Sequence, residues 1–358
     1  MTAMAQDSAL GDGAQDSALG DGAQDSALGD GAQDSALGGG AQDSALGDMV
    51  QAGQPADAAA SAPGAPAEQP TPRRPSLSPS RAADFKTCPL LYRFRTIDRL
   101  PERKSLAAVR GTLVHAVLEK LYDLPARERT VRSAQELVAP AWEELRADPE
   151  VAELFAEGRA ADEEPAARSL EGWLASAGRL VETYFSLEDP SRIEPQGREE
   201  LVEVTLPDGL LLRGYVDRLD VAPNGALRVV DYKTGSMPRE AFEGKALFQM
   251  KFYALVLWRT RGVVASQLKL LYLGNGDALT YAPDEGELVR FERTLRAIWA
   301  AIERAVATGD FRPNRTRLCD WCDHQALCPS FGGTPPPFPA EAAAAAGWHT
   351  QLPIVEHD

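Results

Sequence analysis

The chain has 358 residues and a formal net charge of −16, from 37 basic and 53 acidic side chains. This acidic balance excludes a protein that coats nucleic acid non-specifically, because its bulk charge would repel phosphates. No apolar run approaches the ~18 residues of a membrane span, and the N-terminus lacks the basic and apolar segments of a secretory signal. We therefore expect a cytoplasmic protein whose four cysteines are reduced thiols or metal ligands rather than disulfides.

The first 80 residues are dominated by a repeated nonapeptide and an Ala/Pro-rich segment. The sequence Ala-Gln-Asp-Ser-Ala-Leu-Gly-Asp-Gly begins at residue 5 and recurs from 14, 23, 32 and 41, with small changes in the last two copies. Each copy offers one leucine as its large apolar side chain, which cannot offset the entropy of ordering nine residues at ~1 kcal/mol or more each. We predict a disordered acidic tail and linker over residues 1–80 and assign it no chemistry.

Residues 81–332 read as one folded domain of helices and strands. Leu113, Val117 and Leu121 recur at helical spacing and predict an amphipathic helix within 81–124, and a helical insertion is expected at 125–195. β-rich runs follow at 201–206, 210–220 and 227–234, separated by strong turn signals. The pattern then predicts a helix at 241–258, a strand at 268–273, a long helix at 285–307, a cysteine-bearing loop, and a mobile tail over 333–358.

The second and third β-rich runs carry two carboxylates and a lysine. Asp231 and Lys233 are two apart, so they share one face of a strand. The link between the runs, residues 223–225 (Pro-Asn-Gly), suits a three-residue loop with its glycine in the left-handed region. Such a loop places Asp217 directly opposite Asp231. A two-residue Asn-Gly loop would instead pair Asp217 with Tyr232 and separate the carboxylates onto opposite faces.

This constellation suits metal-assisted chemistry on phosphates. Two carboxylates within ~5 Å repel each other unless a cation lies between them. A hard divalent ion there, beside a lysine, fits attack on a phosphodiester, with the ammonium orienting water or offsetting charge. The alternative is a cross-strand surface salt bridge between Asp217 and Lys233, which the flanking apolar residues disfavour.

Two helices carry further candidates. His115 lies on the first predicted helix and is suited to a third metal contact, although a histidine beside an apolar stripe is often structural. Gln249 and Tyr253 are four apart on the predicted helix after the hairpin and share a face. They are either buried polar residues or groups that hold the lysine or a nucleic-acid backbone.

Taken together, these residues resemble the RecB-type branch of the PD-(D/E)XK nuclease superfamily. Four motifs occur in the family's order: Gly-Thr-Leu-Val-His at 111–115, Gly-Tyr-Val-Asp-Arg at 214–218, Asp-Tyr-Lys-Thr-Gly at 231–235, and Gln-Met-Lys-Phe-Tyr at 249–253. The resemblance implies a mixed α/β fold, a restriction-endonuclease-like core with a mixed β-sheet flanked by helices. It implies that His115, Asp217 and Asp231 bind Mg2+ or Mn2+ and that Lys233 is catalytic. Gln249 and Tyr253 match the family's helical QxxxY motif.

The four cysteines are arranged as Cys88 and, far along the chain, Cys319-x2-Cys322-x5-Cys328. Clustered thiols with short spacings indicate a soft-metal or iron–sulfur site. The residues alone leave Zn2+ and an iron–sulfur cluster equally open, with unligated buried cysteines as a third reading. AddB-type and CRISPR adaptation nucleases share this arrangement, and that resemblance implies a [4Fe-4S] cluster that ties the two ends of the domain together.

The expected partner is DNA. Six basic residues lie between positions 89 and 110, against Asp98 and Glu102. With Tyr92 and Phe94 interleaved, the stretch is a candidate guide for a single strand, although a solvated charged helix fits nearly as well. The sequence lacks a P-loop, so a helicase would be a separate polypeptide.

We therefore expect a metal-dependent exonuclease acting on single-stranded DNA ends in repair or recombination. The alternatives are a CRISPR adaptation nuclease and a non-catalytic DNA-end-binding subunit of a helicase–nuclease assembly. A degenerate, non-catalytic copy would be expected to lose at least one of His115, Asp217, Asp231 and Lys233, and all four are present.

Overall fold

The computed structural model describes residues 74–155, 169–237 and 243–352. The predicted tail and linker over 1–80 therefore lies almost wholly outside the described residues. None of the helices in the described ranges combines the length and apolar character needed to span a bilayer.

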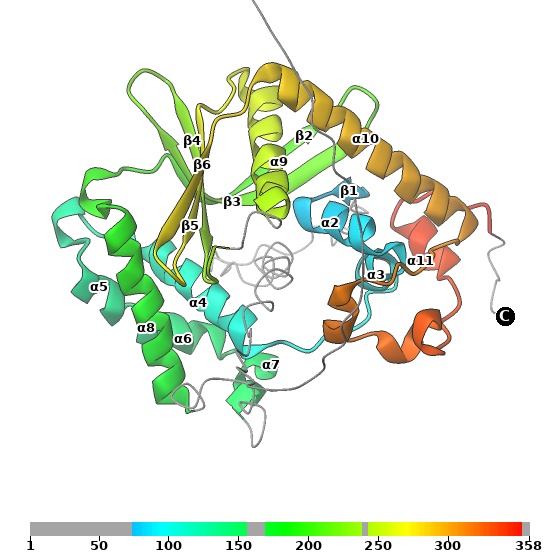
Figure 1. The fold of residues 1–358 in the computed structure, drawn as a ribbon, viewed down its shortest axis with the longest axis horizontal. Helices are drawn as coiled ribbons and strands as arrows, with labels where there is room; N and C mark the ends of the chain where they lie inside the picture. Colours follow the sequence, from blue (N-terminus) through cyan, green and yellow to red (C-terminus); the bar gives the residue numbers. More distant parts are fainter. Residues whose placement is uncertain (1–73, 156–168, 238–242, 353–358) are drawn as a thin grey trace, which may run out of the picture. The chain divides into compact units, whose positions relative to one another are not determined.

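A mixed six-stranded sheet lies at the centre of the described residues, as the expected fold class requires (Figure 1). Its strand order is β1-β3-β4-β5-β6, with β2 paired to β3. The β1–β3 and β4–β5 pairs are parallel and the others antiparallel. The strands are β1 (Ser76–Leu77), β2 (Gly197–Thr205), β3 (Leu211–Val221), β4 (Leu227–Lys233), β5 (Gln267–Tyr272) and β6 (Asp277–Tyr281). Neither β1 nor β6 was expected, and β1 places the start of the fold within the predicted linker.

Two hairpins of the same construction position β3. The β2–β3 loop is Pro-Asp-Gly at 207–209, and the β3–β4 loop is Pro-Asn-Gly at 223–225. Gly209 has a φ of 91° and Gly225 a φ of 82°. The N–H of Ala222 donates to the carbonyl of Ala226 at 2.9 Å. The three-residue loop therefore forms as predicted.

The register that follows from the second loop is also the predicted one. Arg218 pairs with Val230 and Leu219 with Val229. The next positions outward along the two strands are Asp217 and Asp231. On the other edge of β3, Arg198 pairs with Arg218 and Glu200 with Val216.

Helices cover both faces of the sheet and bury alternate residues of its strands (Figure 1). One group of helices packs against Val230, Tyr232 and Leu271 of the sheet. This group is α4 (Leu106–Leu121), α5 (Val131–Glu136), α6 (Val138–Leu145), α7 (Pro149–Ala152) and α8 (Leu170–Leu187). Val229 and Leu270 face the other group, α2 (Pro79–Thr87), α3 (Pro89–Tyr92), α9 (Glu243–Arg261) and α10 (Glu285–Thr308). This alternation follows from the two-residue period of a strand.

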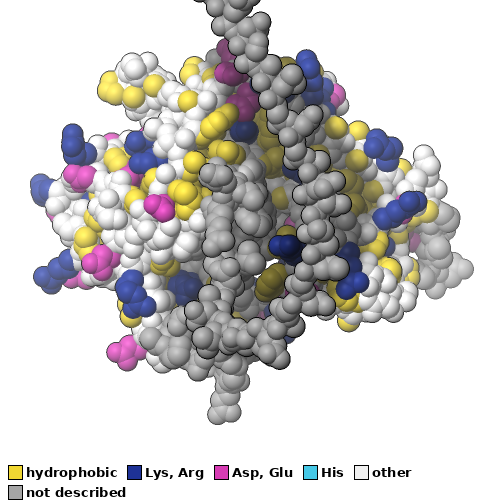
Figure 2. All heavy atoms as spheres, in the orientation of Figure 1, with side chains coloured by type: hydrophobic (Ala, Val, Ile, Leu, Met, Phe, Trp, Pro, Cys, Tyr) yellow, Lys and Arg dark blue, Asp and Glu magenta, His cyan; other side chains and the backbone are white. Residues whose placement is uncertain are grey.

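Shorter helical segments connect these elements. A π-helical turn follows α3 at Arg93–Ile97. The 3-10 turns are Ala126–Glu128, Glu153–Phe155, Pro190–Arg192, Arg317–Trp321, Gln325–Leu327 and Pro329–Phe331. On the described part of the face in Figure 2, lysine and arginine side chains are scattered among acidic and apolar ones and form no continuous stripe.

The C-terminal residues pack onto the domain through α11 (Ala340–Ala345) and aromatic contacts. Trp348 lies 5.0 Å from Trp299 between ring centroids, and Phe338 stacks on Phe311. The expected mobile tail over 333–358 is therefore not what the structure shows up to Leu352. The two aromatic side chains, which composition alone hides among alanine and proline, anchor the segment.

Replacing Gly225 with alanine should lower the free energy of unfolding by about 1 kcal/mol, because a Cβ is unfavourable at this left-handed backbone. No heavy atom lies within 4 Å of the added Cβ, so the cost is conformational. Urea denaturation measures it. Gly178→Ala, equally open but inside helix α8, is the matched control and should stabilise the protein. Equal stability of Gly225→Ala and the wild type would contradict the loop analysis.

Candidate active site

The backbone of Tyr232, near the end of β4, connects three elements at the candidate site. Its N–H donates to Oδ2 of Asp217 at 2.7 Å, and its carbonyl lies 3.0 Å from Nε2 of His115. Because a carbonyl oxygen only accepts, Nε2 carries the proton. The other ring nitrogen, Nδ1, lies 3.5 and 3.6 Å from carboxylate oxygens of Asp217 and Glu199, so it is placed to bind a metal ion through its lone pair.

His115 on α4, Glu199 on β2 and Asp217 on β3 form a candidate metal site. Each offers one ligand atom, and these atoms all lie within 4.8 Å of one another. The side chains are only 6%, 15% and 10% exposed, respectively. An imidazole nitrogen with carboxylate oxygens is a donor set that suits Mn2+ or Mg2+. These residues therefore fit the divalent ion expected from the sequence.

The electrostatics of Asp217 show why a cation would be favourable there. Burial raises the pKa of Asp217 to about 6, and the neighbouring Glu199 carboxylate adds to the rise. His115, Lys233 and the Tyr232 N–H lower the same pKa, but the net change is upward. A bound divalent ion would favour the ionised carboxylates and offset their repulsion.

Glu199 was absent from the predicted site. It lies opposite Asp217 on β2, because the pairs on either side of it are Arg198 with Arg218 and Glu200 with Val216. A signal for this was present in the sequence. The Pro-Asp-Gly loop at 207–209 has the same pattern as the loop that correctly predicted the β3–β4 register, and counting outward from it pairs Glu199 with Asp217.

A second group of contacts at the same strand end joins Asp231, Lys233, Gln249 and Tyr253. The Lys233 ammonium lies 2.9 Å from Oδ2 of Asp231 and donates to Oε1 of Gln249 at 3.0 Å. Nε2 of Gln249 in turn donates to the Tyr253 hydroxyl at 3.1 Å. The lysine is thus held between a strand carboxylate and the glutamine–tyrosine pair of α9. Asp217 and Lys233 are both largely buried, so the alternative of an exposed surface salt bridge does not describe this site.

Tyr253 lies close to both aspartates. Burial raises the pKa of Tyr253, and the Asp231 and Asp217 carboxylates raise it further. Its ring packs over Gly214 on β3, where an added Cβ would lie only 2.9 Å from ring atom Cε1. Gly214, the first residue of its motif, therefore allows the close approach of α9 to the sheet.

Asp231 lies beside the metal-ligand candidates His115, Glu199 and Asp217 rather than among them. The group of mutually close ligand atoms among the described residues contains His115, Glu199 and Asp217, whereas Asp231 contacts Lys233. Its assignment as a metal ligand remains a prediction. Its position next to Asp217 along the hairpin keeps it within reach of the same region.

The opposite face of β3 carries a buried, fully paired arginine. The Arg218 guanidinium is completely buried. It donates to the hydroxyls of Tyr122, Tyr184 and Tyr232, at 2.8–3.2 Å, and to the carboxylates of Glu188 and Asp220. This network positions the side chain of Tyr232, whose backbone contacts His115 and Asp217.

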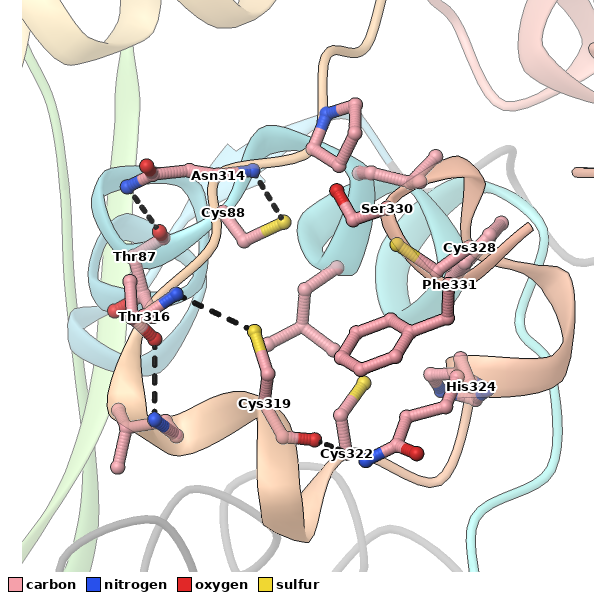
Figure 3. Close-up of a pocket in the computed structure, with 16 residues that line it drawn as sticks. Thr87, Cys88, Asn314, Thr316, Cys319, Cys322, His324, Cys328, Ser330 and Phe331 are labelled. Carbon is pink, nitrogen blue, oxygen red and sulfur yellow. Dashed lines mark hydrogen bonds between the residues drawn. The ribbon is translucent and has the colours of Figure 1, made fainter. Parts of the chain in front are cut away.

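The four cysteines meet at one small cavity of about 50 Å3 (Figure 3). Cys88 comes from the segment between α2 and α3, and the other three come from the 3-10 turns after α10. The sulfur of Cys88 accepts from the Asn314 N–H at 3.4 Å, and that of Cys319 from the Thr316 N–H at 3.3 Å. Burial raises the pKa of the Cys322 thiol. The predicted grouping of Cys88 with Cys319, Cys322 and Cys328 is therefore present.

The sulfurs surround the cavity rather than converge on a point. Among the described residues, His115, Glu199 and Asp217 are the group whose ligand atoms lie within 4.8 Å of one another. No three of the four cysteine sulfurs, all of which are described, lie that close together.

The expected stacking surface on the basic stretch is wrong. Tyr92 and Phe94 are buried in the core and cannot stack on bases. Arg93 pairs with Asp98 at 3.0 Å, and Arg95 pairs with Asp84 and Glu102. Arg93 and Arg95 thus pair with carboxylates of the protein, and two of these, Asp98 and Glu102, lie within the same segment.

Comparison with known proteins gives one family and several relatives. The sequence profile of the PD-(D/E)XK nuclease superfamily matches residues 76–329. The Gene 69 protein of Mycobacterium phage D29 is 27% identical over 272 residues, covering 71% of this chain and 96% of the phage protein. The Gene 69 protein of Mycobacterium phage L5 is 26% identical over 291 residues, with the same coverage. A crystal structure from Eubacterium rectale, of a protein provisionally called an exonuclease, aligns with a TM-score of 0.44 at 15% identity, covering 70% of this chain and 87% of that one.

Asp217→Asn should stabilise the metal-free protein at pH 7.5, because the native state there must keep a buried carboxylate ionised. The pKa of Asp217 rises from 3.8 to about 6 in the native state, so the native state binds the proton more tightly than the unfolded state. The wild type therefore gains stability as the pH falls from about 6 to about 4, and the advantage of the variant disappears over that range.

Urea unfolding in EDTA at pH 4 and pH 7.5 measures this difference. Saturating Mn2+ should reverse the order at pH 7.5, because it stabilises the wild type through native-state binding. A variant less stable than the wild type at pH 7.5 in EDTA would contradict the proposed cost of the buried charge.

Proposed function

The chain belongs to the PD-(D/E)XK nuclease superfamily, and we propose that it is a divalent-metal-dependent exonuclease of the RecB-type branch that acts on single-stranded DNA ends. The observation that carries the proposal is the convergence of His115, Asp217 and the Asp231–Lys233 pair on the last residues of β4. We place this nuclease domain at 81–332, extended at its start to strand β1 (Ser76–Leu77), with an insertion at 125–195, in a cytoplasmic protein of DNA repair or recombination.

His115, Asp217 and Asp231 would hold Mg2+ or Mn2+ at this strand end. When bound, such an ion polarises a phosphoryl oxygen and lowers the pKa of a bound water. Lys233 is fixed by Asp231 and Gln249, so its ammonium is positioned to offset charge on the scissile phosphate or to orient the attacking water. Tyr253 supports Gln249 from the next turn of α9.

The cysteine cavity would hold a [4Fe-4S] cluster. In a tetrahedral zinc site with Zn–S bonds of about 2.3 Å, all four sulfurs would lie about 3.8 Å apart. A [4Fe-4S] cluster binds each thiolate to a different iron and so needs four cysteines around one cavity, which is the arrangement of these four residues. The backbone N–H groups that point at Cys88 and Cys319 are also typical of cluster sites.

A preference for single strands is supported by the surface beside the cysteines. Trp321, between Cys319 and Cys322, is 58% exposed, and Phe331 is also exposed. The Arg315 guanidinium lies over the Phe331 ring, 5.0 Å from its centroid. Exposed aromatic rings with arginine form the kind of surface on which unpaired bases stack. This surface takes the role that the sequence had assigned to Tyr92 and Phe94.

The alternatives use the same site differently. A CRISPR adaptation nuclease would share the catalytic residues and the cysteine site, and genome neighbourhood distinguishes it. A non-catalytic DNA-end-binding subunit would bind DNA without cleaving it. A helicase partner, if one acts with this chain, would be a separate polypeptide.

Lys233→Ala should reduce cleavage by about 100-fold or more while DNA binding is retained, because the ammonium acts mainly on the reacting phosphate. The assay uses anaerobically purified full chain on end-labelled single- and double-stranded DNA, with Mn2+ or with EDTA. Lys251→Ala is the matched control, since Lys251 is on α9 but pairs with Glu287. Unchanged cleavage by Lys233→Ala, or cleavage in EDTA, would refute the mechanism. Equal rates on both DNA forms would refute the strand preference.

Cys88→Ala should lower the melting temperature by about 5 °C or more, because a metal group at these cysteines closes a very long loop. Cys88 and its neighbour Asn314 are 226 positions apart in the chain. Anaerobic wild-type protein should be brown and contain iron and sulfide in near-equal amounts, and oxygen should bleach it. Colourless protein with one tightly bound zinc per chain would instead identify a zinc site.

A further inference from the structure

We infer that Glu199, on β2, is a further ligand of the divalent ion, in addition to the residues expected from the family motifs. The inference rests on the metal site of the proposed function and adds a residue from a strand that carries none of the four motifs. It follows from the strand register, from the backbone conformation of Glu199 and from the charges around it.

The register aims Glu199 at the site. Glu199 lies opposite Asp217 across the β2–β3 ladder, and its Oε1 is 3.6 Å from Nδ1 of His115. The next residue along, Glu200, pairs instead with Arg261 at 3.2 Å. Two adjacent glutamates therefore have different surroundings, one in the candidate metal site and one in an ordinary ion pair.

The backbone of Glu199 is unusual. Its φ is 43°, and Arg99 is the other non-glycine residue in the described ranges with a positive φ. The pairs before and after it keep the same register, so no residue is inserted into either strand at this position. Residues other than glycine and asparagine rarely adopt this region without a compensating interaction.

The charges around Glu199 point in the same direction. Its side chain is 15% exposed, and its carboxylate lies within 4.8 Å of the ligand atom of Asp217, so two carboxylates face each other in a largely buried place. Among the described residues, no lysine or arginine forms an ion pair with Glu199, and its carboxylate instead lies 3.6 Å from Nδ1 of His115. A divalent cation between the imidazole and the two carboxylates would offset both the repulsion and the left-handed backbone.

The test is Mn2+ binding to the full-length chain, purified anaerobically, freed of loosely bound metal with EDTA and dialysed. Isothermal titration calorimetry compares the wild type with Glu199→Gln, Glu200→Gln and Asp217→Asn. We expect the Kd for Mn2+ to rise about tenfold or more in Glu199→Gln and to change less than about twofold in Glu200→Gln. In EDTA, Glu199→Gln should melt no lower than the wild type, and its melting temperature should rise less when Mn2+ is added.

The outcomes separate this inference from the proposed function. Wild-type affinity in Glu199→Gln, with affinity lost in Asp217→Asn, would overturn the role of Glu199 and leave the metal site standing. A lower melting temperature in EDTA with unchanged Mn2+ affinity would overturn it in favour of a purely structural role. A wild type that binds no Mn2+ would overturn the metal site itself. If Glu199→Gln does not fold, Glu199→Asn, which tolerates the left-handed region, replaces it.

Discussion

The pairing of β3 with its two neighbouring strands determines which side chains meet at the candidate site. A shift of one residue in either hairpin would move the acidic side chains to the other face of the sheet. Two loops of the same type, Pro-Asp-Gly at 207–209 and Pro-Asn-Gly at 223–225, fix both registers. As a result, Glu199, Asp217 and Asp231 occupy neighbouring positions on three adjacent strands. The helices then add His115 from one side and Gln249 from the other.

The two faces of the sheet differ in how their charges are compensated. On one face, Arg218 is buried and hydrogen-bonded to three tyrosines and two carboxylates, so its charge is fully paired. On the other face, burial and the nearby Glu199 raise the pKa of Asp217. Tyr232 connects the two faces, because its side chain joins the Arg218 network and its backbone contacts Asp217 and His115. The paired network on one face thus supports the acidic residues of the candidate site on the other.

Much of this arrangement can be predicted from the sequence, and what cannot has identifiable reasons. Turn chemistry gave the β3–β4 register, and helical spacing placed Gln249 and Tyr253 on one face of α9. The same turn chemistry, applied to the first loop, predicts that Glu199 lies opposite Asp217. The left-handed backbone of Glu199 cannot be predicted, because glutamate does not favour that conformation. The two-residue strand β1 has no periodicity of its own and exists through its pairing with β3. Tyr92 and Phe94 were misassigned because interleaved basic residues suggest a surface, whereas their arginine neighbours pair with carboxylates and the aromatic rings fill the core.

The most direct measurement of the metal site is anomalous diffraction at the manganese edge from crystals of the full chain soaked in Mn2+. We expect an anomalous peak within bonding distance of Nδ1 of His115 and of the Asp217 carboxylate, at the end of β4. A crystal that binds Mn2+ elsewhere and shows no peak between these two residues, while the dissolved protein cleaves DNA with Mn2+, would contradict the assignment of this site as the catalytic centre.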